Sequence, residues 1–366
     1  MAAEPAAPGP LALTAWLLPE QADLVAAIAD AAGFTVAAVG TPAVGRAQEL
    51  AARFEARPLD DLRAAISSAG PGPLLIAAAG QFGRPGQALD GEVLLNARQR
   101  GVLVASFDPL PSSLADLLAA GQLPPLDERA AAPGHAPSAS LAWAALGPPA
   151  RSWGACGELT DLLPAFGAAR TGCVQCLGPP TEGGLGARLL DAMDLAAAVF
   201  GEPETVDASF ANPLLTRNLH ATPGEALHGL SGDLTANVRF PGGRSCCLLA
   251  SDRASSWDVS VTLVGPAGRL SCGAGGVQWL TPEGTPSDAA PKLAARQPGS
   301  RAARSGGPSP RVRMVADHLK TLVRAGHAGV EGYDMVLALA MGQAALLSAR
   351  TGECERPATM MRMAGV

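Results

Sequence analysis

The chain has 366 residues, and its 27 lysines and arginines against 33 aspartates and glutamates give a formal net charge of −6. This length suggests two domains and is ample for a sizeable core. An acidic chain with scattered arginines argues against a nucleic-acid binder, which needs a basic stripe. The sequence has no uncharged apolar run long enough for a transmembrane helix, so we expect no membrane partner.

The N-terminal region and the cysteines indicate a compartment. The apolar stretch 11–18 lacks a basic flank and a following cleavage site, so no signal peptide is predicted. The seven cysteines are odd in number and irregularly spaced, which does not resemble a disulfide framework. We therefore expect reduced thiols in a cytoplasmic protein.

The first part of the chain alternates strand and helix patterns. Strands are predicted at 11–18, 34–39, 73–79 and 102–106, with helices at 19–33, 44–54, 59–66, 87–100 and 113–120. Thr41 and Pro42 are predicted to cap and open the second of these helices. Such alternation is typical of a parallel, right-handed α/β sheet.

The second part changes to strands in sequence. Strands are predicted at 171–177, 205–210, 234–240, 245–250, 259–264 and 269–272, with a helix at 185–200 and two helices closing the chain. Glycine-containing turns at 241–243 and 265–268 predict hairpins, and hence a mostly antiparallel sheet. The fold class is therefore α/β followed by α+β.

These patterns predict a division into domains. We expect a disordered tail over 1–10, a first domain over 11–122, a linker over 123–150, a second domain over 151–350 and a tail over 351–366. Residues 281–310 are low in complexity and are expected to be flexible. The arginines of that region are expected to be solvated: Arg296, Arg301, Arg304, Arg311 and the nearby Arg313.

The sequence of the turn after the first strand indicates whether a dinucleotide site is present. Such a site needs glycines, because only then do backbone N–H groups approach the pyrophosphate. Here the turn 19–23 reads PEQAD, with two carboxylates and no glycine. Thr41 stands after the second strand, where an acidic residue would hold a ribose hydroxyl. Tight dinucleotide binding in the usual manner is not expected.

A glycine cluster at 183–186 follows a strand and opens a helix. It could cradle an anion beside Arg188, but a tight turn that needs positive φ is favoured, because glycine patterns alone are weak. A P-loop is excluded more firmly, since neither Lys292 nor Lys320 follows a glycine.

The cysteines and histidines give few candidates. Cys173 and Cys176 lie in a strand-like run, as does the adjacent pair Cys246 and Cys247, and buried small hydrophobes are favoured over metal or redox chemistry. No metal site is predicted. His318 is expected to pack in the core, while the loop residues His220 and His228, near Asp233, are the best histidine candidates for acid/base work.

Asp191 and Asp194 lie three residues apart on the predicted helix and share one face. Two close carboxylates can divide the roles of acid and base. Alternatively, one caps a turn while the other is solvated.

Four stretches then resemble a known family. They are 34–54 (FTVAAVGTPAVGRAQELAARF), 101–113 (GVLVASFDPLPSS), 182–208 (EGGLGARLLDAMDLAAAVFGEPETVDA) and 343–353 (QAALLSARTGE). In order and spacing they resemble the Gfo/Idh/MocA oxidoreductases. The resemblance implies a Rossmann-like N-terminal domain, a C-terminal domain on an open, mostly antiparallel sheet, NAD(P) as cofactor, a sugar-like ligand and a homo-oligomer formed through that sheet.

Against this family, the chain departs at functional positions. The lysine of the Glu-Lys-Pro motif is matched by Asp108, and the catalytic histidine by Asp191. The first aspartate of the same pattern is matched by Ala187, while the last is kept as Asp194. The ribose-reading acid is matched by Thr41.

These losses predict a catalytically atypical or inactive member that acts as a binding or assembly protein. The alternative is an active NAD(P)-dependent oxidoreductase on a sugar or cyclitol. It would use Asp191 and Asp194, with a contribution from His220 or His228, and would bind its cofactor at the altered positions Pro19, Glu20 and Thr41.

Overall fold

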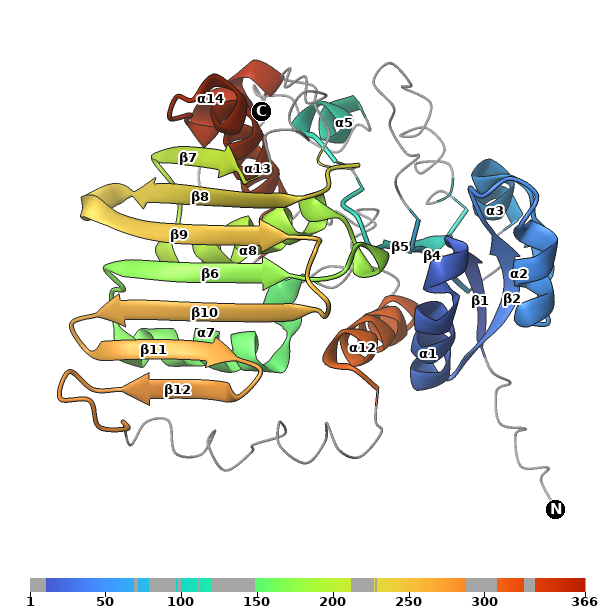
Figure 1. The fold of residues 1–366 in the computed structure, drawn as a ribbon, viewed down its shortest axis with the longest axis horizontal. Coiled ribbons are helices and arrows are strands. Elements are labelled where there is room, and N and C mark those ends of the chain that lie inside the picture. Colours follow the sequence, from blue (N-terminus) through green and yellow to red (C-terminus); the bar gives the residue numbers. More distant parts are fainter. Residues whose placement is uncertain are drawn as a thin grey trace.

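The computed structural model describes residues 11–68, 72–78, 97, 100–110, 112–119, 149–211, 227, 229–287, 308–325 and 333–365, which form two sheets with flanking helices (Figure 1). Several predictions lie outside the described residues. They concern the tail over 1–10, most of the helix over 87–100, the linker up to residue 148, the segment 288–307, and His220 and His228.

The first sheet is parallel throughout, with the strand order β3-β2-β1-β4-β5. Its strands are β1 (Leu11–Trp16), β2 (Phe34–Gly40), β3 (Arg57–Leu59), β4 (Pro73–Ile76) and β5 (Leu103–Ser106). The helices of this region are η1 (Pro19–Gln21), α1 (Ala22–Ala32), α2 (Ala47–Arg53), α3 (Leu62–Ser68) and α5 (Leu114–Ala119). The predicted parallel α/β sheet is confirmed.

Local signals explain most of these boundaries. Gly33 ends α1 in the left-handed region, with φ of 74°, which favours glycine. The Ser113 hydroxyl accepts the Asp116 N–H at the start of α5, which was predicted as a helix over 113–120. The predicted cap at Thr41 is wrong, because the Thr41 hydroxyl accepts the Ala43 N–H within a turn and α2 begins only at Ala47.

The second sheet has seven strands in the order β12-β11-β10-β6-β9-β8-β7, and only β6 and β9 pair in parallel. Its strands are β6 (Thr171–Leu177), β7 (Thr205–Phe210), β8 (Asp233–Phe240), β9 (Arg244–Ser251), β10 (Asp258–Gly265), β11 (Gly268–Gly273) and β12 (Gly276–Leu280). The predicted hairpins β8–β9 and β10–β11 are present, so the mostly antiparallel sheet is confirmed.

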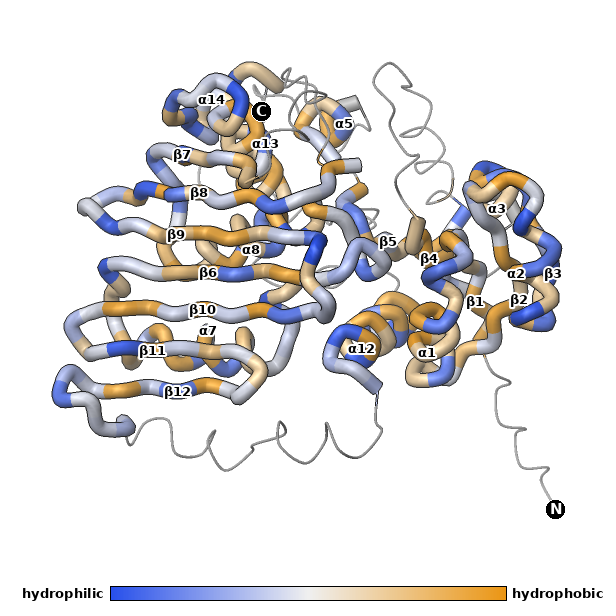
Figure 2. The backbone as a smooth tube through the Cα atoms, in the orientation of Figure 1, coloured by the Kyte–Doolittle hydropathy of each residue, from blue (hydrophilic) through white to orange (hydrophobic). Residues whose placement is uncertain are grey.

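One face of this sheet is covered by α7 (Gly154–Phe166), α8 (Leu185–Phe200) and α13 (Met335–Thr351), and no described helix lies over the other face (Figure 1). The strands alternate accordingly: Val238 of β8 is buried, whereas Thr235, Asn237 and Arg239 are exposed. Figure 2 shows this alternation of polar and apolar residues along the strands. A homo-oligomer formed through this sheet, which the family resemblance implies, stays a prediction.

Helix α12 (Pro310–Ala325) comes late in the chain but packs against α1 of the first region (Figure 1). Val315 and Leu319 belong to the same buried cluster as Val25 and Ile28. Helix α12 thus brings a late part of the chain to the region between the two sheets. The predicted domain boundaries stay a prediction. The short helices η2 (Ala150–Ser152), η3 (Pro180–Glu182), η4 (Pro241–Gly243) and the C-terminal α14 (Pro357–Ala364) complete the described elements.

None of the helices in the part of the chain that the structure describes combines the length and apolarity needed to span a bilayer.

Candidate functional site

In open parallel sheets, ligands bind at the carboxyl ends of the strands, and a dinucleotide's pyrophosphate lies at the turn after the first strand. Here Gln21 occupies that turn and is 2% exposed. Its Oε1 accepts the Leu18 N–H at 2.8 Å, and its Nε2 donates to the carbonyls of Ala77 and Thr181, both at 2.9 Å. The side chain thus links the turn to β4 and to η3.

The chemistry of the same turn is unfavourable to NAD(P). The Leu18 N–H is bonded to Gln21, and the exposed Glu20 and Asp23 bring carboxylates to the first turns of η1 and α1. Like charges repel a pyrophosphate, although Asp23 is ion-paired with Arg53. The residues present do not fit a dinucleotide bound in the usual manner.

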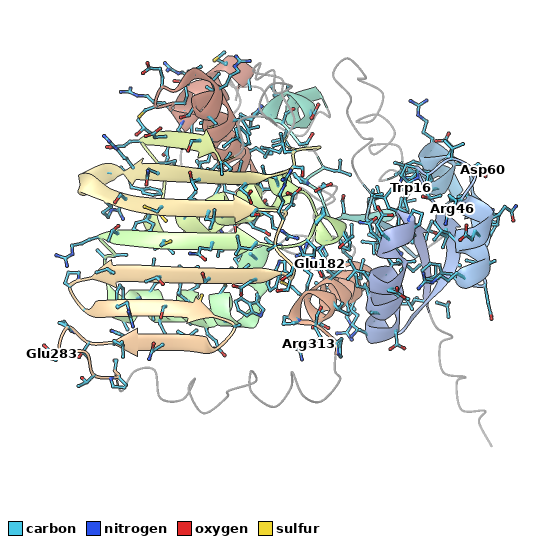
Figure 3. The ribbon with its side chains drawn as sticks, in the orientation of Figure 1. Trp16, Arg46, Asp60, Glu182, Glu283 and Arg313 are labelled. Carbon is cyan, nitrogen blue, oxygen red and sulfur yellow. The ribbon has the colours of Figure 1, made fainter. Side chains whose placement is uncertain are left out.

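A cavity of about 450 Å³ lies at the carboxyl ends of β1, β2 and β3. Its lining includes Trp16, Thr41, Gln48, Asp60 and Asp61, and Figure 3 shows Trp16 and Asp60 at this end of the sheet. A Cβ at Gly40 would lie 2.4 Å from the Trp16 ring, so glycine is required there for the indole to pack. Of the three predicted cofactor positions, Thr41 lines this cavity.

Two buried arginines lie between the sheets. Arg188 of α8 is 0% exposed and Arg311 of α12 is 2% exposed. Both guanidinium groups donate to the Glu182 carbonyl, at 3.0 Å and 3.5 Å respectively, and Figure 3 shows Glu182 in the region between the sheets. Burial lowers the pKa of Arg311 to about 10, and burial raises the pKa of Glu182. The expectation that Arg311 is solvated is wrong.

Some polar atoms of these buried side chains have no partner among the residues that the structure describes. The Nε and Nη1 atoms of Arg188 and the Oε2 atom of Glu182 are buried and make no hydrogen bond within those ranges. Arg188 also lies against the backbone at Gly178, where a Cβ would come within 2.6 Å of its guanidinium. Arg311 lies 5.9 Å from the ring centres of Phe107 and Trp257, so it is held between two aromatic rings.

The glycine cluster at the start of α8 binds a side-chain carboxylate, that of Asp108. The Gly184 N–H donates to Oδ1 of Asp108 at 2.7 Å. Gly183 has φ of 122°, as the turn interpretation predicts, and a Cβ at Gly186 would lie 1.7 Å from the Leu227 carbonyl oxygen. Asp108 thus supplies the anion at this helix N-terminus.

Asp191 and Asp194 share a face of α8, and both bind residues at the start of the second region. Oδ1 of Asp191 accepts the Ala150 N–H at 2.9 Å. Asp194, whose side chain is 2% exposed, forms a two-pronged ion pair with Arg151, which also lies 5.7 Å from the Tyr333 ring centre. The aspartates therefore anchor the segment that leads into α7. Ala187, one turn earlier, is buried and carries no polar group.

The environment of these carboxyls favours their neutral form. Burial raises the pKa of Asp194 to about 7, although Arg151 opposes the shift, and burial also raises the pKa of Asp191 against Arg311 and Arg188. A folded-state pKa above the unfolded value adds stability that is complete below about pH 4 and is lost as the pH rises through 7.

From pH 6 to pH 8 we expect the free energy of unfolding to fall by about 1.4 kcal/mol on account of Asp194, the equivalent of one pKa unit. Urea unfolding at both pH values measures the change, and it should shrink in Asp194→Asn. An equal change in the wild type and the variant would contradict this assignment.

The other predicted candidates are dispersed. Cys176 is buried and Cys173 half-buried, on opposite faces of β6. His318 is 9% exposed on α12, as predicted for a packed residue. Within the described ranges, no group of three or more His, Cys, Asp or Glu residues is placed to hold a metal ion.

Sequence reasoning missed three of the site's main residues. Arg151 and Arg311 resemble solvated arginines in sequence, and Gln21 is an ordinary residue of a turn. Their roles depend on contacts with segments at least 40 residues away, at Asp194, Glu182 and Thr181. The role of Gln21 was indicated in the sequence only by the absence of glycine from the turn 19–23, which implies that a side chain occupies it.

No known family model and no curated protein matches this sequence. Solved structures match its fold over nearly the full chain. An oxidoreductase from Agrobacterium radiobacter, in complex with NAD+, L-tartaric acid and magnesium, is 16% identical, with coverage of 96% of this chain and 99% of its own and a TM-score of 0.61. The WlbA dehydrogenase from Bordetella pertussis, in complex with NADH and UDP-GlcNAcA, is 15% identical, with coverage of 96% of this chain and 99% of its own and a TM-score of 0.63.

A myo-inositol dehydrogenase from Corynebacterium glutamicum is 15% identical over 95% of this chain and 98% of its own, with a TM-score of 0.59. At these identities the likeness concerns the fold. The chain has the fold of the Gfo/Idh/MocA-type dehydrogenases.

Proposed function

We propose that the chain is a catalytically inactive relative of these NAD(P)-dependent dehydrogenases and acts as a binding or assembly protein. The observation that carries the proposal is Gln21, whose three hydrogen bonds fill the turn at which a dinucleotide's pyrophosphate would bind. A buried amide with satisfied partners is costly to displace, because each freed group loses about 1–3 kcal/mol. A hydride donor would therefore lack its anchoring site.

The catalytic positions support the same conclusion. Oxidation of a sugar hydroxyl needs a group that accepts its proton and a cation that stabilises the developing charge. The sequence resemblance matches Asp108 to the family's lysine and Asp191 to its histidine. Asp108 accepts a hydrogen bond from Gly184, and Asp191 accepts one from Ala150. Loss of a single preorganised donor costs about 2.7–4 kcal/mol of barrier lowering, or 10²–10³-fold in rate.

One observation favours the alternative of an active NAD(P)-dependent oxidoreductase on a sugar or cyclitol. The cavity at the carboxyl ends of β1 to β3 remains open to a small ligand and is lined by Thr41. In that case Asp191, whose pKa is raised, would accept the proton.

An activity panel separates the two proposals. We expect neither the wild type nor Asp108→Lys to convert NAD(P)+ to NAD(P)H with sugars and cyclitols, because the variant restores the lysine but leaves the Gln21-filled turn. Absorbance of the reduced nicotinamide measures the reaction. Turnover by the wild type that Asp191→Asn abolishes would establish the alternative, and activity gained by Asp108→Lys would contradict the proposed role of the turn.

A further inference from the structure

Two cysteines from distant parts of the sequence meet where α7 packs on the seven-stranded sheet. Cys156 lies in the first turn of α7 and Cys272 lies on β11, and their sulfur atoms are 3.9 Å apart. The two residues are 116 positions apart in the chain, and both are buried, at 1% and 5% exposure. Every cysteine of the chain is free in the structure, so the pair is present as two thiols.

We propose that Cys156 and Cys272 are a redox-active pair that closes to a disulfide and so ties α7 covalently to the sheet. The sulfur–sulfur bond of a disulfide is about 2.05 Å long. Since the two sulfurs are already in contact, bond formation shortens their separation by roughly 2 Å. Side-chain rotation together with a small shift of the first turn of α7 supplies this change.

The first turn of α7, which covers the pair, is weakly held. Gly154 and Gly157 flank Cys156, and each glycine weakens a helix by about 1 kcal/mol relative to alanine. A Cβ at either glycine would meet no atom within 4 Å, so close packing does not fix this turn. The side chain of Trp153, the N-cap residue, makes no capping hydrogen bond. Local opening of the turn therefore admits a small oxidant to the thiols and lets the sulfurs approach.

The two thiols have different roles in the reaction. The hydrogen bond from the Cys156 thiol, together with the Val261 N–H group, lowers the pKa of Cys272 although burial opposes the shift. The same hydrogen bond and burial raise the pKa of Cys156. Cys272 is therefore the thiolate that reacts first with an oxidant, and Cys156 is the neighbouring thiol that completes the disulfide.

Hydrogen peroxide, a small neutral molecule, serves as the oxidant. The Cys272 thiolate attacks a peroxide oxygen, the O–O bond breaks, and the leaving hydroxide takes the Cys156 proton to form water. The Cys156 thiolate then attacks the sulfenic sulfur of Cys272, so that the S–S bond forms and the S–O bond breaks. The second hydroxide takes up the proton that Cys272 released on ionisation. The two sulfurs thus lose two electrons, and the peroxide is reduced to two waters.

The test uses the full-length chain with Cys247→Ser and Cys354→Ser, because these two exposed thiols would cross-link separate molecules. The reduced protein is treated with a small excess of hydrogen peroxide, unfolded, alkylated at its remaining thiols and digested with trypsin without reduction. Cleavage after arginine and lysine gives the peptides 152–170 and 270–292, each with a single cysteine. We expect mass spectrometry to find these two peptides joined by a disulfide and the other cysteines alkylated.

Thermal unfolding gives a second readout. The oxidised protein should melt about 5 °C higher than the same sample reduced with dithiothreitol, because the disulfide closes a loop of 116 residues and long loops gain most from closure. Cys156→Ala and Cys272→Ala should each abolish this shift. Cys246→Ala is the matched control and should keep it, since the buried Cys246 thiol contacts the Cys247 carbonyl and not a second thiol.

The linked peptides are measured in a protein that keeps both thiols, so this result does not depend on how the alanine variants fold. Alkylation of both Cys156 and Cys272 after peroxide treatment, or a disulfide from either to another cysteine, would overturn the proposal. Equal melting temperatures of the oxidised and reduced protein would overturn the covalent tie between α7 and the sheet. None of these results involves a nucleotide, so they leave the proposed loss of catalysis unaffected.

Discussion

Asp194→Ala is expected to lower the free energy of unfolding by about 3–5 kcal/mol at pH 8, because it leaves the guanidinium of Arg151 largely buried without its carboxylate. The variant should also loosen the segment before α7, because Asp194 and Asp191 together hold that segment through their bonds to Arg151 and Ala150. Chemical denaturation of the purified variant measures the effect.

The exposed ion pair between Arg46 and Glu49 provides the control for Asp194→Ala. Glu49→Ala should cost less than about 1 kcal/mol, since both partners of this pair are in water. In a double-mutant cycle, the variant that carries both Arg151→Ala and Asp194→Ala should lose less free energy of unfolding than the sum of the losses in the two single variants. Additive losses would mean that the two side chains stabilise the fold independently.

Gln21→Ala is expected to lower the free energy of unfolding by about 3 kcal/mol, the net worth of its three hydrogen bonds at roughly 1 kcal/mol each. It frees the Leu18 N–H and the carbonyls of Ala77 and Thr181. Because the Leu18 N–H loses its acceptor, the Oε1 atom of Gln21, hydrogen exchange at the Leu18 amide should also quicken.

Two variants make the Gln21 result specific. Gln48→Ala, on the exposed side of α2, should change stability by less than about 0.5 kcal/mol. Gln21→Glu keeps the acceptor for Leu18 but sets a carboxylate against two carbonyl oxygens, so it should cost at least as much as the alanine. A fully stable Gln21→Glu would show that packing, and not this hydrogen-bond set, holds the turn.

The sequence predicted the parts of the fold that depend on local patterns. In the described ranges before residue 120, strands and helices alternate as expected, and the hairpins at 241–243 and 265–268 are present. Helix α7 was not predicted, because Gly154, Gly157 and Pro164 weaken its pattern, and the fold supports it by packing against β11 and β12.

The candidate site was predictable only where single residues carry the signal. The missing glycines after β1 could be read directly from the chain, while the replacements at Asp108 and Asp191 are implied only by the family resemblance. The burial of Arg311 could not, because a short segment rich in Pro, Gly and Ser precedes it and its partners lie on α8 and η3. The contact between Cys156 and Cys272 likewise depends on the packing of α7 against β11, between residues 116 positions apart in the chain.

The most direct test of the central claim is a calorimetric titration of the purified protein with NAD+, NADH, NADP+ and NADPH, together with thermal unfolding at each concentration. A ligand at about 100 times its Kd stabilises a fold by about 2.7 kcal/mol, which a melting curve resolves. We predict no binding heat and no stabilisation by any of the four nucleotides, because Gln21 fills the turn and Glu20 and Asp23 add negative charge to it. Saturable binding of any one of them, with matching stabilisation, would contradict the account and restore the oxidoreductase alternative.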